Sequence, residues 1–256
     1  MQSYPRPSIV ESLGLRPVRE RLPQALIALR GAEDVPPSRF DWTSLSLLRP
    51  RYAIPLWLGR EALPRKVLLT NLFNHRQTPV EEGWSVRRTQ VEDFRGRGMT
   101  YDSHNGTDLS VPRGTLAVAP AAGRVARVYT EFNRGGLKVV IDHGAGLMTC
   151  SAHLARALVR EGDRIGPGQP YAVTGYSGLD GFATFPWGVP HIHFNVWLDG
   201  APVDPFGDPS LWRGGSPTPV PDSPPEEGWS PPRYDDALVD EVIAGCRTAS
   251  VRGWLS

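Results

Sequence analysis

The chain has 256 residues, of which 40% are hydrophobic, so it is long enough for one domain with a sizeable core and appended segments. With 28 basic against 27 acidic residues its formal net charge is +1, which gives no electrostatic basis for nucleic acid or an anionic membrane as the main partner. No stretch approaches the roughly 20 consecutive apolar residues of a membrane helix, and charged residues interrupt the N-terminus where an export signal would need an apolar run.

The first 95 residues are expected to form a lobe of mixed structure attached to the main domain. Leu22, Leu26 and Leu29 recur at helical spacing, which predicts one or two short helices within residues 8–31 that pack against that domain. Residues 52–58 and 66–70 predict short extended segments. The default position for His75, which follows them, is at the surface or in a cap; the alternative is that its loop borders a cleft.

Short strand-like runs separated by glycine, proline and asparagine turns begin near residue 96. They cover residues 114–120, 123–129, 137–142, 147–153 and 171–174. This pattern is typical of an antiparallel β-fold, and the glycine-rich segment 175–181 predicts a tightly turned loop after it. The expected fold class is therefore mainly β, with a compact antiparallel sheet.

The most informative strand is predicted over residues 189–198. Its apolar residues alternate with polar ones, so one face turns to the core while the other carries His191, His193 and Asn195. Two imidazoles that share an open face are typical of a metal site, and a zinc ion with its water is the commonest occupant.

Two upstream segments add further donors. His104 and Asp108 are four positions apart, and His153 ends the strand predicted over 147–153. These segments are expected to converge with the histidine strand on one open sheet face, which indicates a metal site.

The same alternation predicts which side chains of that second strand are buried. Cys150 falls on the apolar face with Met148, Ala152 and Leu154, so it is expected to be a small buried residue, while His153 lies on the opposite, more polar face. His143 precedes a Gly-Ala-Gly turn and is assigned a structural role.

Four short motifs follow one another in a fixed order: His104-x-x-x-Asp108, Ser151-Ala152-His153-Leu154, Gly175-x-Ser177-Gly178 and His191-x-His193. Their combined order resembles the lysostaphin/LytM-type zinc endopeptidases, which cleave peptide bonds in bacterial peptidoglycan. The resemblance covers about residues 96–206 and implies an antiparallel sheet with an open groove across it.

Carried over residue by residue, the resemblance implies one zinc ion per chain with His104, Asp108 and His193 as its ligands. The two catalytic histidines outside the ligand set would be His153 and His191. Three protein ligands leave a fourth position for water. Which histidine acts as the general base stays open.

The chain departs from the family pattern in the loop before the histidine pair, which is lengthened. Its aromatic residues either shape the groove or pack within the loop: Phe182, Phe185 and Trp187. This departure leaves substrate preference open.

The implied function is a zinc metalloendopeptidase that hydrolyses peptidoglycan cross-links or stem peptides. One alternative is a non-catalytic cell-wall or regulatory module that keeps the fold; another is a binding or carrier module on a similar scaffold. The resemblance suggests the cell envelope or exterior although no signal peptide is visible. Location, the bond cleaved and the oligomeric state stay open.

The expected domain organisation has three parts. Residues 1–95 form the N-terminal lobe, and residues 96–212 form the metallopeptidase domain. Residues 213–256 begin with a proline-rich linker and end in a helical tail, in which Leu238, Val242 and Ile243 would share one helix face.

Overall fold

The computed structural model describes residues 4–33, 35–63, 67–76, 78–79, 83–93 and 97–206. The linker and helical tail predicted over 213–256 lie outside these residues. The helices are α1 (Ile9–Ser12), α2 (Val18–Arg30), α3 (Pro50–Trp57) and α4 (Leu179–Thr184), with a 3-10 helix over Trp42–Leu47. The strands are β1 (Ser38–Arg39), β2 (Leu68–Asn71), β3 (Trp84–Ser85), β4 (Thr107–Ser110), β5 (Leu116–Val118), β6 (Gly123–Glu131), β7 (Gly136–Gly144), β8 (Leu147–Ala157), β9 (Arg164–Ile165), β10 (Pro170–Thr174), β11 (Ile192–Leu198) and β12 (Ala201–Val203).

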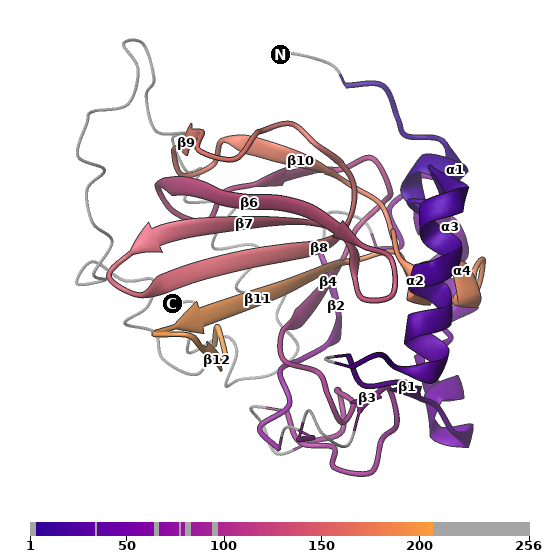
Figure 1. Cartoon of the computed structure of the whole chain (residues 1–256). Coiled ribbons are helices and arrows are strands. Elements are labelled where there is room, and N and C mark those ends of the chain that lie inside the picture. Colours follow the sequence, from indigo (N-terminus) through magenta and orange to yellow (C-terminus); the bar gives the residue numbers. More distant parts are fainter. Residues whose placement is uncertain are drawn as a thin grey trace.

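The described part of the chain is built on one large antiparallel sheet, with its helices gathered at one end (Figure 1). The main path of the sheet runs β2-β4-β11-β8-β7-β6-β9, while β10 pairs with β8 and β5, and β12 pairs with β11. All of these pairs are antiparallel, whereas β1 and β3 form a separate parallel pair. The mainly β, antiparallel fold expected from the sequence is confirmed.

The alternation in β11 sorts its side chains as predicted. Ile192 belongs to the main core cluster, to which β7 contributes Val139 and Ile141 and β8 contributes Leu154. Phe194 packs against this cluster. Val196 belongs to a smaller cluster with Leu147. The opposite face of β11 is therefore free to carry polar groups.

The N-terminal segments differ from the sequence expectation in two places. Residues 52–58, predicted as extended, lie mostly within α3, because the buried positions Ala53, Leu56 and Trp57 recur at helical spacing. Proline opens this helix at a position that needs no backbone N–H partner. The apolar composition of residues 52–58 and the proline within them favoured an extended segment where the structure has a helix.

The helices predicted within residues 8–31 are present as α1 and α2, but the predicted packing face of α2 is wrong. Leu22, Leu26 and Leu29 are 64%, 42% and 62% exposed. α2 instead packs through Ala28, which is buried. The Gln24 side chain of α2 also accepts the backbone N–H of Phe132 in the β6–β7 turn.

The large sheet draws one strand, β2, from the N-terminal side of residue 95. β2 pairs with β4, so the predicted domain boundary runs between two neighbouring strands of one sheet. No helix in the described part of the chain is long and apolar enough to cross a bilayer.

Candidate metal centre

The register of three strands brings the predicted donors together. His193 on β11 lies opposite Asp108 on β4 and opposite Ala152 on β8. His153 directly follows Ala152, and His104 lies in the short loop that leads into β4. Strand pairing, rather than proximity in sequence, therefore places four of the five predicted site residues side by side.

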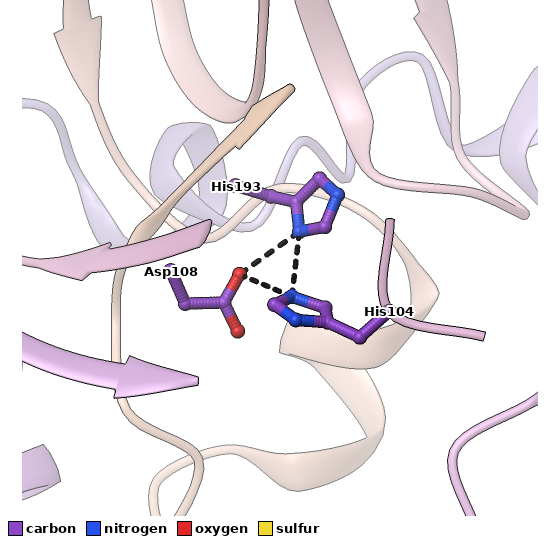
Figure 2. A group of neighbouring side chains, drawn as sticks. All are labelled: His104, Asp108 and His193. Carbon is purple, nitrogen blue, oxygen red and sulfur yellow. Dashed lines mark hydrogen bonds and ion pairs between the residues drawn. The ribbon is translucent and has the colours of Figure 1, made fainter. Parts of the chain in front are cut away.

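His104, Asp108 and His193 form a compact triangle of donor atoms (Figure 2). The Nε2 atom of His104 lies 2.9 Å from Oδ1 of Asp108 and 3.1 Å from Nδ1 of His193, and the third edge, from Nδ1 of His193 to Oδ1 of Asp108, is 2.9 Å. His104 and Asp108 are fully buried. A tetrahedral zinc site with bonds of 2.0–2.1 Å has edges of about 3.3 Å, so a small expansion fits the ion.

The hydrogen bonds on the far side of each ring decide which nitrogen faces the centre. Nδ1 of His104 donates to the carbonyl oxygen of Leu72 at 2.6 Å. Nε2 of His193 donates to Oδ1 of Asn105 at 3.3 Å, an oxygen that also accepts from the Asn195 amide. In neutral rings this leaves lone pairs on Nε2 of His104 and on Nδ1 of His193.

Three acceptor atoms then face one another without a proton among them. Such an arrangement is repulsive unless a cation lies between the donors, and two imidazoles with one carboxylate suit a divalent transition metal such as zinc. The residues present therefore fit a metal ion.

Electrostatics favour the metal-binding protonation states. Burial opposes ionisation of Asp108, but the nearby His104, His191 and His193 outweigh it and hold the pKa of the carboxyl well below its usual value. Burial lowers the pKa of His193 to about 4, although Asp108 opposes that shift. Near neutral pH the site therefore offers a carboxylate and an unprotonated His193 ring.

Further hydrogen bonds and close contacts hold the predicted metal ligands in place. The Asn71 amide donates to the other oxygen of Asp108, at 2.7 Å, and the neighbouring Leu72 carbonyl orients His104. Gly106 leaves room for β11, because a Cβ there would lie 2.6 Å from the Phe194 carbonyl oxygen and 2.9 Å from Nε2 of His193. Such outer contacts tune both ligand orientation and metal affinity.

His153 reaches the site through an irregularity in β8 that the sequence pattern did not predict. Val139 pairs with Ser151 and Leu137 with Leu154, so β8 spans three steps where β7 spans two. His153 occupies this bulge with a left-handed φ of 61°.

The bulge also corrects the predicted faces of β8. Cys150 and Ala152 line the groove together with His153, whereas Ser151 turns inward and bonds to the Tyr171 hydroxyl in the core at 2.5 Å. Cys150 is buried as expected, but on the groove side. A strict period of two gave the wrong face because the histidine enters through the extra residue.

Ser177, from the glycine-serine-glycine motif, positions His153. The Ser177 carbonyl accepts from Nδ1 of His153 at 2.8 Å, and the Ser177 amide donates to the His153 carbonyl at 3.3 Å. The hydroxyl of Ser177 donates to Leu154 and accepts from the backbone N–H of Leu137. This network leaves Nε2 of His153 as the ring nitrogen with the lone pair.

His191 directly precedes β11 and completes the cluster. Its Nδ1 donates to the Val189 carbonyl at 2.7 Å, and its Nε2 lies 3.5 Å from Oδ1 of Asp108. The His191 and His153 rings are 4.8 Å apart between centroids, and Tyr176 contacts both. Burial and the neighbouring His191 ring lower the pKa of His153 well below its usual value.

The other two histidines take part in the scaffold. Both ring nitrogens of His143 are bonded, to the Ala122 carbonyl and to the Thr149 hydroxyl, each at 2.8 Å, which agrees with its predicted structural role. His75 is half exposed and bonds to Asp204 at 3.0 Å.

A groove of about 370 Å³ runs past the cluster and includes His153 and His193 in its lining. The N-terminal ninety-five residues also contribute to its lining, through Trp84, Ser85 and Val86 among others. The aromatic residues of the 182–187 loop are not among the lining residues of this groove; Phe185 instead packs edge-on against Trp57, with ring centroids 5.0 Å apart.

Sequence reasoning missed several contributors to the site. Asn71, at the end of β2, and Leu72, just after it, orient two of the predicted metal ligands. Trp84 of β3 and Arg134 of the β6–β7 turn line the groove. Single asparagines and tryptophans carry no spacing signal, so no pattern in the chain singles them out.

The groove across an antiparallel sheet, with two imidazoles and a carboxylate converging beside two further histidines, has the layout of a metallopeptidase site. Residues 102–205 match the model of peptidase family M23. This part of the chain is therefore similar to that family, of the lysostaphin/LytM type.

Curated relatives resemble the same region. A stretch of 129 residues is 33% identical to the peptidoglycan DD-endopeptidase ShyA of Vibrio cholerae, covering 49% of this chain and 28% of the relative. An uncharacterized metalloprotease of Haemophilus influenzae is 32% identical over 40% of this chain and 20% of its own length. The murein hydrolase activator EnvC of Escherichia coli is 32% identical over 44% of this chain and 23% of its own length. The chain thus spans only about a fifth to just over a quarter of these relatives.

Among solved structures, a zinc-containing peptidase from Vibrio cholerae is similar at 27% identity and a TM-score of 0.40. The match covers 55% of this chain and 38% of that structure.

Proposed function

We propose that the chain is a zinc-dependent endopeptidase that hydrolyses peptide bonds in peptidoglycan cross-links or stem peptides. The observation that carries this proposal is the convergence of three lone-pair donors beside two histidines whose Nε2 atoms are not used by the scaffold. In this proposal His104, Asp108 and His193 hold the metal, and His153 and His191 are catalytic.

A bound zinc ion would polarise the scissile carbonyl and lower the pKa of a coordinated water towards about 7. The chain's own residues supply the rest. The lowered pKa of His153 means that this ring is unprotonated at neutral pH and enters the reaction as a proton acceptor at Nε2.

His191 is held by its Nδ1–H in a similar way, with Nε2 turned toward the Asp108 carboxylate. Together the two rings accept and return the proton that moves between attacking water and leaving amine, and they stabilise the developing oxyanion. Backbone carbonyls hold both rings, so little reorganisation is needed when the substrate arrives.

The substrate class is supported by the relatives named for peptidoglycan DD-endopeptidase activity, ShyA and ShyB of Vibrio cholerae. The groove past the cluster gives an extended peptide room to pass the donor triangle. We assign this activity to residues 96–212, with residues 1–95 as the lobe that walls the groove and residues 213–256 as a linker and tail.

The alternative, a non-catalytic module, has one relative in its favour, because EnvC is named as an activator of murein hydrolases. A module of that kind needs neither a metal nor the two additional histidines. The present chain has all five residues of the cluster and the hydrogen bonds that orient them, which favours the enzyme.

Hydrolysis of purified sacculi tests the proposal. The zinc-loaded full chain should release soluble peptide fragments, and His153→Ala and His191→Ala should each abolish release while zinc stays bound. His75→Ala is a matched control, since it removes a histidine outside the cluster. Zinc binding without turnover on any wall peptide would instead identify a non-catalytic module.

A further inference from the structure

The turn between β6 and β7 places a positively charged side chain in the lining of the groove. Arg134 lies in this turn and lines the groove together with Trp84 of β3. The guanidinium carbon of Arg134 is 2.7 Å from the centre of the Trp84 ring. Stacking on an aromatic face holds a guanidinium in place without using its hydrogen-bond donors.

Arg134 forms no ion pair with a carboxylate in the described part of the chain. Lys138, which also lines the groove, forms an ion pair with Glu131. Asp180, which also lines the groove, and Glu131 act on the charge of Arg134 from beyond ion-pair distance. Burial lowers the pKa of Arg134 to about 9, so the side chain is still charged at neutral pH.

In the corner of the groove formed by Arg134 and Trp84, two hydrogen-bond donors lack acceptors among the residues that the structure describes. They are Nη1 of Arg134 and Nε1 of Trp84, both buried. Neither nitrogen can accept a hydrogen bond, so only an acceptor can satisfy them. A buried donor left unpaired is costly, which makes the corner ready for an anionic or carbonyl ligand.

The corner is joined directly to the catalytic cluster. Gly135, next to Arg134, accepts the backbone N–H of His153 at 2.6 Å. Gly136 packs so closely on Ser177 that a Cβ there would lie 2.2 Å from its hydroxyl. A group bound by Arg134 would therefore be held at a fixed position relative to His153.

We propose that Arg134 and Trp84 form a subsite that binds a carboxylate of the peptide substrate close to the bond that is cleaved. This inference rests on the proposed endopeptidase function and adds a specificity to it: peptides with a free carboxylate beside the scissile amide are preferred over their carboxamides. Arg134 supplies charge and paired donors, and the Trp84 indole supplies one further N–H.

The test uses the zinc-loaded full chain and cross-linked muropeptide dimers in two forms, with free carboxylates and with the same groups converted to carboxamides. We expect kcat/KM to be about 10- to 100-fold higher for the carboxylate form, the range of a charge-assisted hydrogen bond. Arg134→Gln should remove this preference by lowering only the rate on the carboxylate form. Arg134→Lys should keep part of it.

Trp84→Phe keeps an aromatic face and should reduce the preference by a smaller factor, about 2- to 10-fold. Arg127→Gln is the matched control: it removes the same charge from an exposed position on β6 outside the groove and should leave the preference unchanged. Equal rates on both forms with the wild-type chain, or a preference that survives Arg134→Gln, would overturn the subsite.

Calorimetric binding of the same two dimers separates this inference from the proposed function. If neither form is cleaved but the carboxylate form binds about 10-fold or more tightly in an Arg134-dependent manner, the hydrolase proposal fails and the subsite stands. If both forms are cleaved and bind alike, the subsite fails and the hydrolase proposal stands.

Discussion

Ser177 holds His153 at both the ring and the backbone, with its carbonyl 2.8 Å from the ring Nδ1 and its amide 3.3 Å from the His153 carbonyl. The Ser177 side chain in turn joins β7 and β8 through Leu137 and Leu154. The glycine-serine-glycine motif, which has no chemistry of its own, is therefore a clamp that fixes His153 in a bulged strand.

Ser177→Ala tests this clamp. The change leaves the buried N–H of Leu137 and the carbonyl of Leu154 without their hydroxyl partner, so we expect the free energy of unfolding to fall by about 1–3 kcal/mol. We also expect kcat on sacculi to fall, because the loop that orients His153 loosens. Urea denaturation and fragment release measure the two effects.

The control is Thr115→Val, which removes a hydroxyl bonded to the Pro112 carbonyl away from the groove. It should cost stability but leave kcat unchanged. If Ser177→Ala loses stability and keeps full kcat, the serine is a purely structural residue.

Gly106→Ala should weaken metal binding. The added Cβ would lie 2.6 Å from the Phe194 carbonyl oxygen and 2.9 Å from the His193 ring, so β11 must shift away from β4. We expect zinc affinity to fall at least about 10-fold, as for other changes to the surroundings of metal ligands. Competition with a chromogenic chelator measures it.

Gly98→Ala is the comparison for Gly106→Ala, because a Cβ there meets only an ordinary contact at 4.0 Å. It should bind zinc like the wild type. Unchanged zinc affinity in Gly106→Ala would mean that the close approach of the loop to β11 is not needed for the site.

Asn71→Asp should also lower zinc affinity, by about 10- to 100-fold. The substitution replaces the amide that donates to Asp108 at 2.7 Å with a carboxylate that repels it. Equilibrium dialysis against buffered zinc gives the dissociation constant. Asn133→Asp adds the same charge elsewhere in the groove lining, and equal losses in both variants would show a general charge effect.

His143 should make stability depend on pH. Burial lowers its pKa in the folded chain below the usual value of about 6.5. Between these two pKa values the unfolded chain therefore binds more protons, so the stabilising contribution is complete above about pH 6.5 and is lost as the pH falls below it.

The measurement is urea unfolding of the wild type and of His143→Gln in the presence of a chelator, at pH 7.5 and at pH 5.5. The advantage of the wild type should be larger at pH 7.5. A difference between the two proteins that is independent of pH, or larger at pH 5.5, would contradict this account of His143.

The sequence predicted the strands and the polar face of β11 because that strand is regular and half buried, so a period of two describes it well. It could not predict the bulge at His153, which depends on how β7 pairs with β8. Nor could it predict that α2 would leave Leu22 and Leu29 exposed, because helical periodicity identifies an apolar side and not the surface that covers it.

The candidate site, too, could be predicted only in part from the sequence. Motif order drew attention to all five central residues, but only strand register brings His193 beside Asp108. The groups that orient the proposed ligands include the backbone carbonyl of Leu72 and the side-chain amide of Asn71. A backbone carbonyl has no sequence motif, so the groups that hydrogen-bond to the proposed ligands are found only from the fold.

The most direct test of the central claim is the zinc content of six proteins after dialysis against buffered zinc: the wild type and alanine variants of His104, Asp108, His193, His153 and His191. We predict one zinc ion per chain for the wild type and for the His153 and His191 variants, and strongly reduced zinc for the other three. Wild-type zinc content in the His104, Asp108 or His193 variant, or its loss in the His153 and His191 variants, would contradict the proposed division between ligands and catalytic histidines.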